Sequence, residues 1–264
     1  MTASYNLADL FEGAARTLGD QEAVVAGGAG VTTVRRTYVE LDRRADRVAN
    51  LLAGQGIRPG DHVGLHAHNS VEFVEVMLAA FKLRAVPINA NYRYTVDELA
   101  YVFADARVKA IVTETGIDDR ARAAAPDVPL TVIGDDYDGR VAAADDTAVD
   151  VGPRSGDDRY LMYTGGTTGM PKGVVWRHED LFFAALGGTG APRHGQARLD
   201  DPADIAAFVT AGTGITRRLP LCPLIHGGAP SVSYTHLTLP TTLNSGGGGG
   251  GGGAAGRGGG GGGG

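Results

Sequence analysis

Residues 161–174 of the chain read LMYTGGTTGMPKGV. An apolar run leads into a glycine-rich loop, and a second apolar run follows it. The loop combines backbone freedom, hydroxyl groups and one cationic side chain. Glycines let the backbone present N–H groups without obstruction, hydroxyls add hydrogen bonds, and a lysine supplies positive charge. This pattern predicts a polyphosphate site formed by Thr164, Gly165, Gly166, Thr167, Thr168, Gly169, Lys172 and Gly173.

Two better-known phosphate motifs do not fit this chain. A Walker A loop requires G-x-x-x-x-G-K-[ST], but the positions five residues after Gly165 and Gly166 hold Met170 and Pro171. The glycines at 27, 28 and 30 do not complete the dinucleotide pattern G-x-G-x-x-G. The remaining alternative is a glycine-rich surface turn that binds nothing.

Strand and helix patterns alternate on both sides of the loop. Helical spacing predicts helices over 7–18, from Thr37 to about residue 54, after Ser70, from Thr95 through residue 103, and over 180–186. Apolar runs predict strands over 61–67, 85–88, 108–113, 130–133, 160–163 and 173–176, and the acidic stretch 135–153 is expected to be a surface connection. This alternation predicts an α/β, doubly wound, mainly parallel sheet covered by helices on both faces.

Composition narrows the class of protein. The net charge of −6 and the absence of a Lys/Arg block argue against a nucleic-acid partner. Cys222 is the only cysteine, which excludes an intrachain disulfide, and neither a signal peptide nor a transmembrane run is apparent. We therefore expect a cytoplasmic protein.

The last part of the chain departs from this pattern. From residue 231 the amphipathic periodicity is lost, and the sequence becomes almost pure glycine from 246 onward. Polyglycine cannot offset its ordering entropy and behaves as a flexible coil. We divide the chain into a folded region, 1–230, and a non-native-looking glycine-rich tail, 231–264, which has the composition that a guanine homopolymer in the DNA would encode.

The stretch YTGGTTGMPKGV closely resembles the signature loop of the AMP-forming acyl-CoA synthetase, luciferase and adenylation-domain superfamily. The resemblance covers about residues 7–230, and the runs YTGGTTGMPKGVVWRHED and PINANYRY (87–94) look most like bacterial fatty-acid or steroid side-chain CoA ligases. It implies that the chain contains part of the large N-terminal domain of an adenylate-forming enzyme. It further implies ATP-dependent conversion of a carboxylic acid to acyl-AMP and then to acyl-CoA.

The resemblance also implies site roles. The loop residues would hold the β- and γ-phosphates of ATP, with Mg²⁺ neutralising their charge and CoA as the second-step substrate. The segment LPLCPLIHGG (219–228) resembles the family segment whose histidine lies beside the acyl pocket, and it assigns that role to His226, as a shaping rather than a proton-abstracting residue. The implied partners are a small carboxylic acid, ATP and CoA, and a homo-oligomer is compatible with the sequence.

Several other residues favour structural roles. His178 is expected to support the start of a helix, with Asp180 as its N-cap. His66 and His68 share a predicted strand face, but no Cys or acidic residue lies at matching spacing, so no metal site is assigned. Packing is the expected role of Tyr92 and Tyr94, and Cys222 reads as a small core residue.

The family motifs that bind adenine and ribose, and the later catalytic lysine, have no counterpart in the sequence. We therefore expect no appreciable synthetase activity from this polypeptide. The alternatives are a stand-alone nucleotide-binding module that uses only the loop, and a truncated chain that folds poorly because apolar faces and sheet edges remain uncovered.

Overall fold

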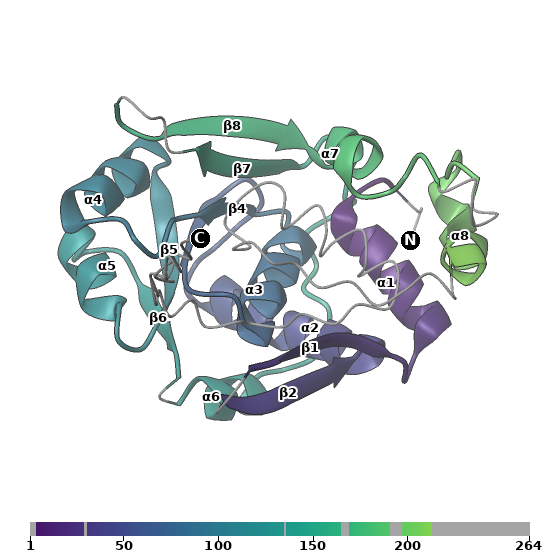
Figure 1. Cartoon of the computed structure of the whole chain (residues 1–264), viewed down its shortest axis with the longest axis horizontal. Helices are drawn as coiled ribbons and strands as arrows, with labels where there is room; N and C mark the ends of the chain where they lie inside the picture. Colours follow the sequence, from purple (N-terminus) through teal and green to yellow (C-terminus); the bar gives the residue numbers. More distant parts are fainter. Residues whose placement is uncertain (1–3, 29–30, 135, 165–168, 191–196, 213–264) are drawn as a thin grey trace, which may run out of the picture.

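The structure is a computed structural model, and it describes residues 4–28, 31–134, 136–164, 169–190 and 197–212. Helices and strands alternate along most of this length (Figure 1). The helices are α1 (Leu7–Leu18), α2 (Tyr38–Gly54), α3 (Val71–Lys82), α4 (Val96–Asp105), α5 (Asp118–Ala124), α6 (Tyr137–Ala143), α7 (His178–Ala185) and α8 (Ile205–Gly212), with a 3-10 turn at Pro202–Asp204. The strands are β1 (Glu22–Gly28), β2 (Val31–Thr37), β3 (His62–His66), β4 (Val86–Asn89), β5 (Val108–Glu114), β6 (Leu130–Ile133), β7 (Arg159–Thr164) and β8 (Lys172–Arg177).

The main sheet has six strands in the order β6-β5-β3-β4-β7-β8. All neighbouring strands are parallel except β7 and β8, which form an antiparallel hairpin. A separate antiparallel pair, β1 and β2, lies at the bottom of Figure 1. The mainly parallel α/β sheet expected from the sequence is confirmed, with the carboxyl ends of β3, β4, β5, β6 and β7 at one edge.

Both faces of the sheet are covered over β3, β4, β5 and β7, whereas β8 is mostly exposed. Alternate strand residues enter two apolar clusters: Leu65 and Val112 pack with α1, α2 and α3, whereas Ile88 and Ile111 pack with α4 and α5. Strand β7 contributes to both clusters, through Tyr160 and Met162 on one side and Leu161 and Tyr163 on the other. A strand that is buried on both faces gives the unbroken apolar run seen in its sequence.

Helix starts follow the predicted capping chemistry. Thr37 with Glu40 and Thr95 with Glu98 form complete capping boxes at α2 and α4, and Ser70 accepts a hydrogen bond from the Phe73 backbone at α3. The predicted stripe on α2, which includes Leu41, Ala45, Val48 and Leu52, is buried. Each cap satisfies backbone N–H groups that a helix start otherwise leaves unpaired.

Two expectations are wrong. Residues 135–153 are more than a connection, since α6 lies within them and buries Tyr137 and Val141. Helix α7 begins at His178, with Arg177 in the N-cap position, so Asp180 lies in the first turn instead of capping it. A carboxylate there still interacts favourably with the positive end of the helix dipole.

Candidate functional site: a phosphate loop at the tip of a hairpin

The glycine-rich loop joins β7 to β8, at the tip of the hairpin in the upper part of Figure 1. Strand β7 runs parallel to β4, so its carboxyl end and the tip lie at the same edge as the carboxyl ends of the parallel strands. Ligands of open α/β sheets bind outside the carboxyl ends of the strands. The fold thus places the predicted phosphate-binding residues where a ligand is expected.

Four of the predicted loop residues lie within the described part of the chain. Thr164 and Lys172 are the last register partners of the hairpin, and the Thr164 hydroxyl donates a hydrogen bond to the Lys172 carbonyl over 3.4 Å. Both residues are exposed. Their placement leaves one hydroxyl and one ammonium group at the two ends of the loop, open to a ligand. The predicted residues Gly165, Gly166, Thr167 and Thr168 lie outside the described residues, as do His226 and Cys222.

Two glycines of the loop, Gly169 and Gly173, lie within the described residues, and each position favours glycine for a different physical reason. Gly169 has φ +132°, a backbone conformation that side-chain-bearing residues rarely adopt, and its position is open to solvent. Gly173 is the register partner of Tyr163, and a Cβ at Gly173 would lie 3.2 Å from the Tyr163 ring. Gly169 therefore serves the loop backbone, whereas Gly173 makes room for an aromatic ring across the hairpin.

Tyr163 fixes the end of β7, a role that the sequence did not reveal. Its hydroxyl donates to Asp105 over 2.5 Å, which links the strand next to the loop to the last residue of α4. Burial and the adjacent Asp105 carboxylate raise the pKa of Tyr163 well above its usual value, so the phenol stays protonated and continues to donate. The aromatic residue before the loop is consequently held on both sides, by Gly173 and by Asp105.

Two histidines expected to share a face have different surroundings. His66 is buried at the end of β3, and its Nδ1 lies 3.1 Å from the Thr113 hydroxyl, while burial lowers its pKa to about 4. His68 is more exposed, contacts Glu114 through its ring nitrogen, and packs against the Tyr92 ring with centroids 4.0 Å apart and ring planes tilted by 34°. Within the described ranges, no group of three His, Cys, Asp or Glu residues is arranged to hold a metal ion.

The expected packing roles of three aromatic side chains agree with the structure. Tyr94 is buried against the α4 side of the sheet, and Tyr92 is partly buried beneath His68. His178 is completely buried at the start of α7, where its Nδ1 accepts a hydrogen bond from the Leu7 backbone over 3.2 Å. His178 therefore supports the fold at the helix start, as its position in the sequence predicts.

Comparison with known proteins settles the family. Residues 11–242 match the family described as AMP-binding enzyme. The chain belongs to the AMP-binding enzyme family. The glycine-rich loop between β7 and β8 lies inside the matched region.

Curated relatives in the AMP-binding family are CoA ligases. A 3-oxocholest-4-en-26-oate–CoA ligase of Rhodococcus rhodochrous is 38% identical over 240 residues, which cover 85% of this chain and 42% of that protein. A medium/long-chain-fatty-acid–CoA/3-oxocholest-4-en-26-oate–CoA ligase of Mycolicibacterium smegmatis is 37% identical, over 88% of this chain and 43% of that protein. The chain thus spans less than half the length of these relatives.

Solved structures of the AMP-binding family share the fold. A Mycobacterium tuberculosis fatty acyl CoA synthetase matches with a TM-score of 0.67 and 27% identity, over 91% of this chain and 44% of that one. ATP-bound MatB from Rhodopseudomonas palustris matches with a TM-score of 0.70 and 26% identity, over 90% of this chain and 44% of that one. The second structure contains ATP, the ligand whose phosphates the loop chemistry suits.

Proposed function

We propose that the loop from Thr164 to Gly173 binds the β- and γ-phosphates of ATP. The observation that carries this proposal is the pairing of Thr164 with Lys172 at the exposed end of the hairpin, at the carboxyl edge of the sheet. The Thr164 hydroxyl can exchange its long 3.4 Å bond to the Lys172 carbonyl for a bond to a phosphate oxygen, and the Lys172 ammonium group adds positive charge beside it. Mg²⁺ enters as the ion carried on ATP, where it neutralises part of the phosphate charge.

The complete enzyme, in this proposal, activates a carboxylic acid to acyl-AMP and transfers the acyl group to CoA. Fatty and steroid side-chain acids are the favoured substrates, because the relatives in Rhodococcus and Mycolicibacterium are named for such acids. The role of His226 beside the acyl pocket, the division at residue 230 and a cytoplasmic location remain parts of the same proposal. In the described ranges, no helix has the length and apolar character needed to cross a bilayer.

The second candidate function is a nucleotide-binding module without acyl transfer. The chain spans only 42% of its Rhodococcus relative, whereas the phosphate loop lies within its own residues. ATP binding requires the loop, but acyl transfer requires a complete active site. The two candidates therefore agree on ATP and differ on the carboxylic acid and CoA.

The test is ATP–Mg²⁺ titration of the 264-residue chain by calorimetry, with a matched pair of lysine variants. Lys172 lies at the loop, whereas Lys109 lies on β5 and forms an ion pair with Asp61 at 2.7 Å. Lys172→Ala is expected to weaken ATP binding at least tenfold, since a charge-assisted contact of about 1.5–3 kcal/mol is lost. Lys109→Ala is expected to leave ATP binding unchanged. Equal affinities of the wild type and Lys172→Ala would contradict the proposed site.

A further inference from the structure

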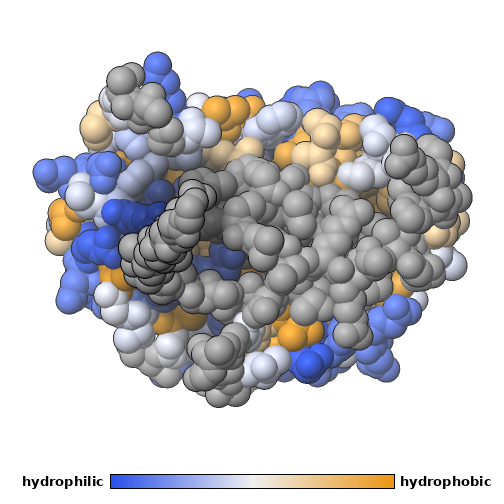
Figure 2. All heavy atoms as spheres, viewed as in Figure 1, coloured by the Kyte–Doolittle hydropathy of each residue, from blue (hydrophilic) through white to orange (hydrophobic). Residues whose placement is uncertain are grey.

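The β7–β8 hairpin has little direct support from the rest of the sheet. Its two strands pair with each other at six register positions, from Arg159↔Arg177 to Thr164↔Lys172. Among the described residues, however, β7 pairs with β4 at only two positions, Ile88↔Leu161 and Asn89↔Met162, and β8 is the outermost strand of the sheet. Exposed Val174 and Val175 accompany this edge position, and Figure 2 shows hydrophobic residues along the upper rim of the molecule, over the hairpin of Figure 1. The direction of the hairpin must therefore depend on other anchors.

One such anchor lies at the base of the hairpin, at the end opposite the loop. Asp158 precedes β7 and His178 follows β8, and the His178 backbone N–H donates to the Asp158 carbonyl over 2.9 Å. The adjacent Glu179 backbone donates to the Gly156 carbonyl over 3.0 Å. These bonds continue the hairpin ladder past both strands and close it at residues 156–179.

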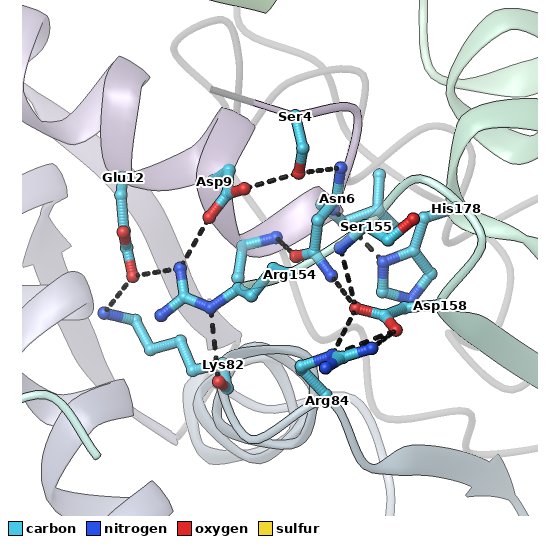
Figure 3. A network of polar contacts seen from close by, with 12 residues as sticks. Ser4, Asn6, Asp9, Glu12, Lys82, Arg84, Arg154, Ser155, Asp158 and His178 are labelled. Carbon is cyan, nitrogen blue, oxygen red and sulfur yellow. Dashed lines mark hydrogen bonds and ion pairs between the residues drawn. The ribbon is translucent and has the colours of Figure 1, made fainter. Parts of the chain in front are cut away.

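The Asp158 carboxylate ties this base to two other segments (Figure 3). Arg84, just after α3, donates to it through Nε and Nη2 over 3.0–3.2 Å. Asn6, the N-cap of α1, donates its side-chain amide over 2.8 Å, and the Ser155 backbone donates over 3.2 Å. Arg84 adopts a positive φ of 56°, which is uncommon for a residue with a side chain. The ion pair with Asp158 is one contact that holds Arg84 in this conformation.

His178 adds a second link between the base and α1. Its Nδ1 accepts the Leu7 backbone N–H, one of the groups that the first turn of α1 leaves unpaired. The ring also meets Phe81 of α3 edge-on, with centroids 4.6 Å apart. Burial lowers the pKa of His178 to about 4, so the ring is neutral near pH 7 and keeps this acceptor. The imidazole and the Asp158 carboxylate thus join α1 and the end of α3 to both strands of the hairpin at its base.

We propose that Asp158 and His178 are positioning residues that set the direction of the β7–β8 hairpin and so aim Thr164 and Lys172 at the phosphates of ATP. This inference rests on the proposed function. Six strand residues extend about 20 Å, so a tilt of about 3° at the base displaces the tip by about 1 Å. Misplacement of catalytic or binding groups by about 1 Å can reduce a rate about 100-fold. The base therefore acts on the loop without touching the ligand, in addition to the bond between Tyr163 and Asp105 near the tip.

The test compares His178→Asn with His178→Leu in the 264-residue chain. The Asn oxygen can occupy the position of Nδ1 and accept the Leu7 N–H, whereas Leu fills the space without an acceptor. Asp158→Asn removes the charge that holds Arg84. The control is Arg44→Met, which breaks a buried ion pair of comparable kind with Glu75 between α2 and α3, away from the hairpin. Each variant is measured for amide hydrogen exchange of residues 159–177 and for ATP affinity by calorimetry.

Tryptophan fluorescence provides a third measurement. Trp176 is its only tryptophan and lies on β8, so its fluorescence reports on the hairpin alone. His178→Leu and Asp158→Asn are expected to speed exchange in β8 at least tenfold, to shift the Trp176 emission, and to weaken ATP binding at least fivefold. His178→Asn is expected to stay within about threefold of the wild type. Arg44→Met is expected to lower global stability without changing β8 exchange or ATP affinity in the folded chain.

Three outcomes would overturn the inference. Unchanged β8 exchange in His178→Leu would show that the base does not hold the hairpin. Faster exchange with unchanged ATP affinity would show that the hairpin direction does not matter for binding. An equal loss of ATP affinity in Arg44→Met would show that the effect is general destabilisation. Failure of the wild-type chain to bind ATP would instead contradict the proposed function and the aiming role together, and hydrogen exchange would still report whether the base holds the hairpin.

Discussion

The ammonium group of Lys82 lies 2.8 Å from an Asp46 carboxylate oxygen in the interior between α2 and α3. Asp42 lies at the same distance, and Glu12 of α1 is 3.2 Å away. Lys82 is 3% exposed, and the three carboxylates together raise its pKa despite the opposing effect of burial. One buried cation thus joins the first three helices, and Glu12 also pairs with Arg154 at 2.9 Å (Figure 3).

Lys82→Met should destabilise the fold strongly. Methionine fills a similar volume, but the variant leaves Glu12, Asp42 and Asp46 without the cation, and loss of one partner from a buried pair costs about 3–5 kcal/mol. Urea denaturation followed by circular dichroism should show this decrease in the free energy of unfolding. The double variant Lys82→Met with Asp46→Leu should recover part of it, because one uncompensated carboxylate is removed. A Lys82→Met variant as stable as the wild type would show that the cluster contributes nothing.

Acid should destabilise the protein through two buried histidines. Burial lowers the pKa values of His66 and His178 to about 4 from an ordinary value near 6.5. The unfolded chain binds protons to these rings more readily, so the stability they contribute is complete above pH 6.5 and is lost as the pH falls toward 4. A fully expressed shift of this size corresponds to about 3 kcal/mol for each ring.

Urea denaturation at pH 7.5 and pH 5 measures this dependence. The lowered pKa of Glu12 contributes only below its ordinary value of 4.5, so that carboxyl is silent in this interval. The unfolding free energy of the wild type should fall between the two pH values, and His178→Asn should show a smaller fall because it has no proton to gain at that position. Equal pH dependence in the wild type and His178→Asn would contradict the assignment for His178.

Acyl-adenylate formation should not be detectable with this polypeptide. The 264-residue polypeptide contains the proposed phosphate-binding loop, but it spans only 42–43% of the length of the CoA ligases that it matches. Carboxylate-dependent exchange between ATP and pyrophosphate is the measurement, with octanoate and a steroid side-chain acid as the two acids. Exchange above the acid-free background with either acid would refute this prediction.

Elements with strong local signals could be predicted from the sequence. Helix α1 and strand β6 have the predicted bounds, because the apolar spacing of the first and the apolar run of the second are unambiguous. The capping boxes at Thr37 and Thr95 marked the starts of α2 and α4 to the residue. In each case the local pattern and the packing of the element indicate the same structure.

Other elements depend on contacts that the sequence does not display. Helix α6 has only seven residues and buries only Tyr137 and Val141, so its amphipathic pattern is too short to stand out in an acidic stretch. The pair β1–β2 has β-bulge irregularities in its register, and α8 packs against α1, where a Cβ at Gly13 would lie 2.4 Å from Ile205. These elements are stabilised mainly by tertiary packing, which local periodicity does not record.

In the candidate site, too, some features could be predicted from the sequence and others could not. Residue types alone predict a phosphate site at Thr164 and Lys172, which stays a prediction, and the structure places both residues at the exposed end of the hairpin. Tyr163 with Asp105, and Asp158 with Arg84, join residues 58 and 74 positions apart, and a single sequence gives no indication of such pairs. These contacts, which support the loop, are therefore shown by the structure alone.

The most direct test of the central claim is competition between phosphate ligands for the 264-residue chain. If the loop holds the β- and γ-phosphates, inorganic tripolyphosphate should displace a fluorescent ATP analogue at concentrations similar to those of ATP, while AMP should require at least 100-fold more. Lys172→Ala should raise the tripolyphosphate concentration needed for displacement at least tenfold. Displacement by AMP as effective as that by tripolyphosphate would mean that the base or ribose carries the binding, and it would contradict a site formed by the loop from Thr164 to Gly173.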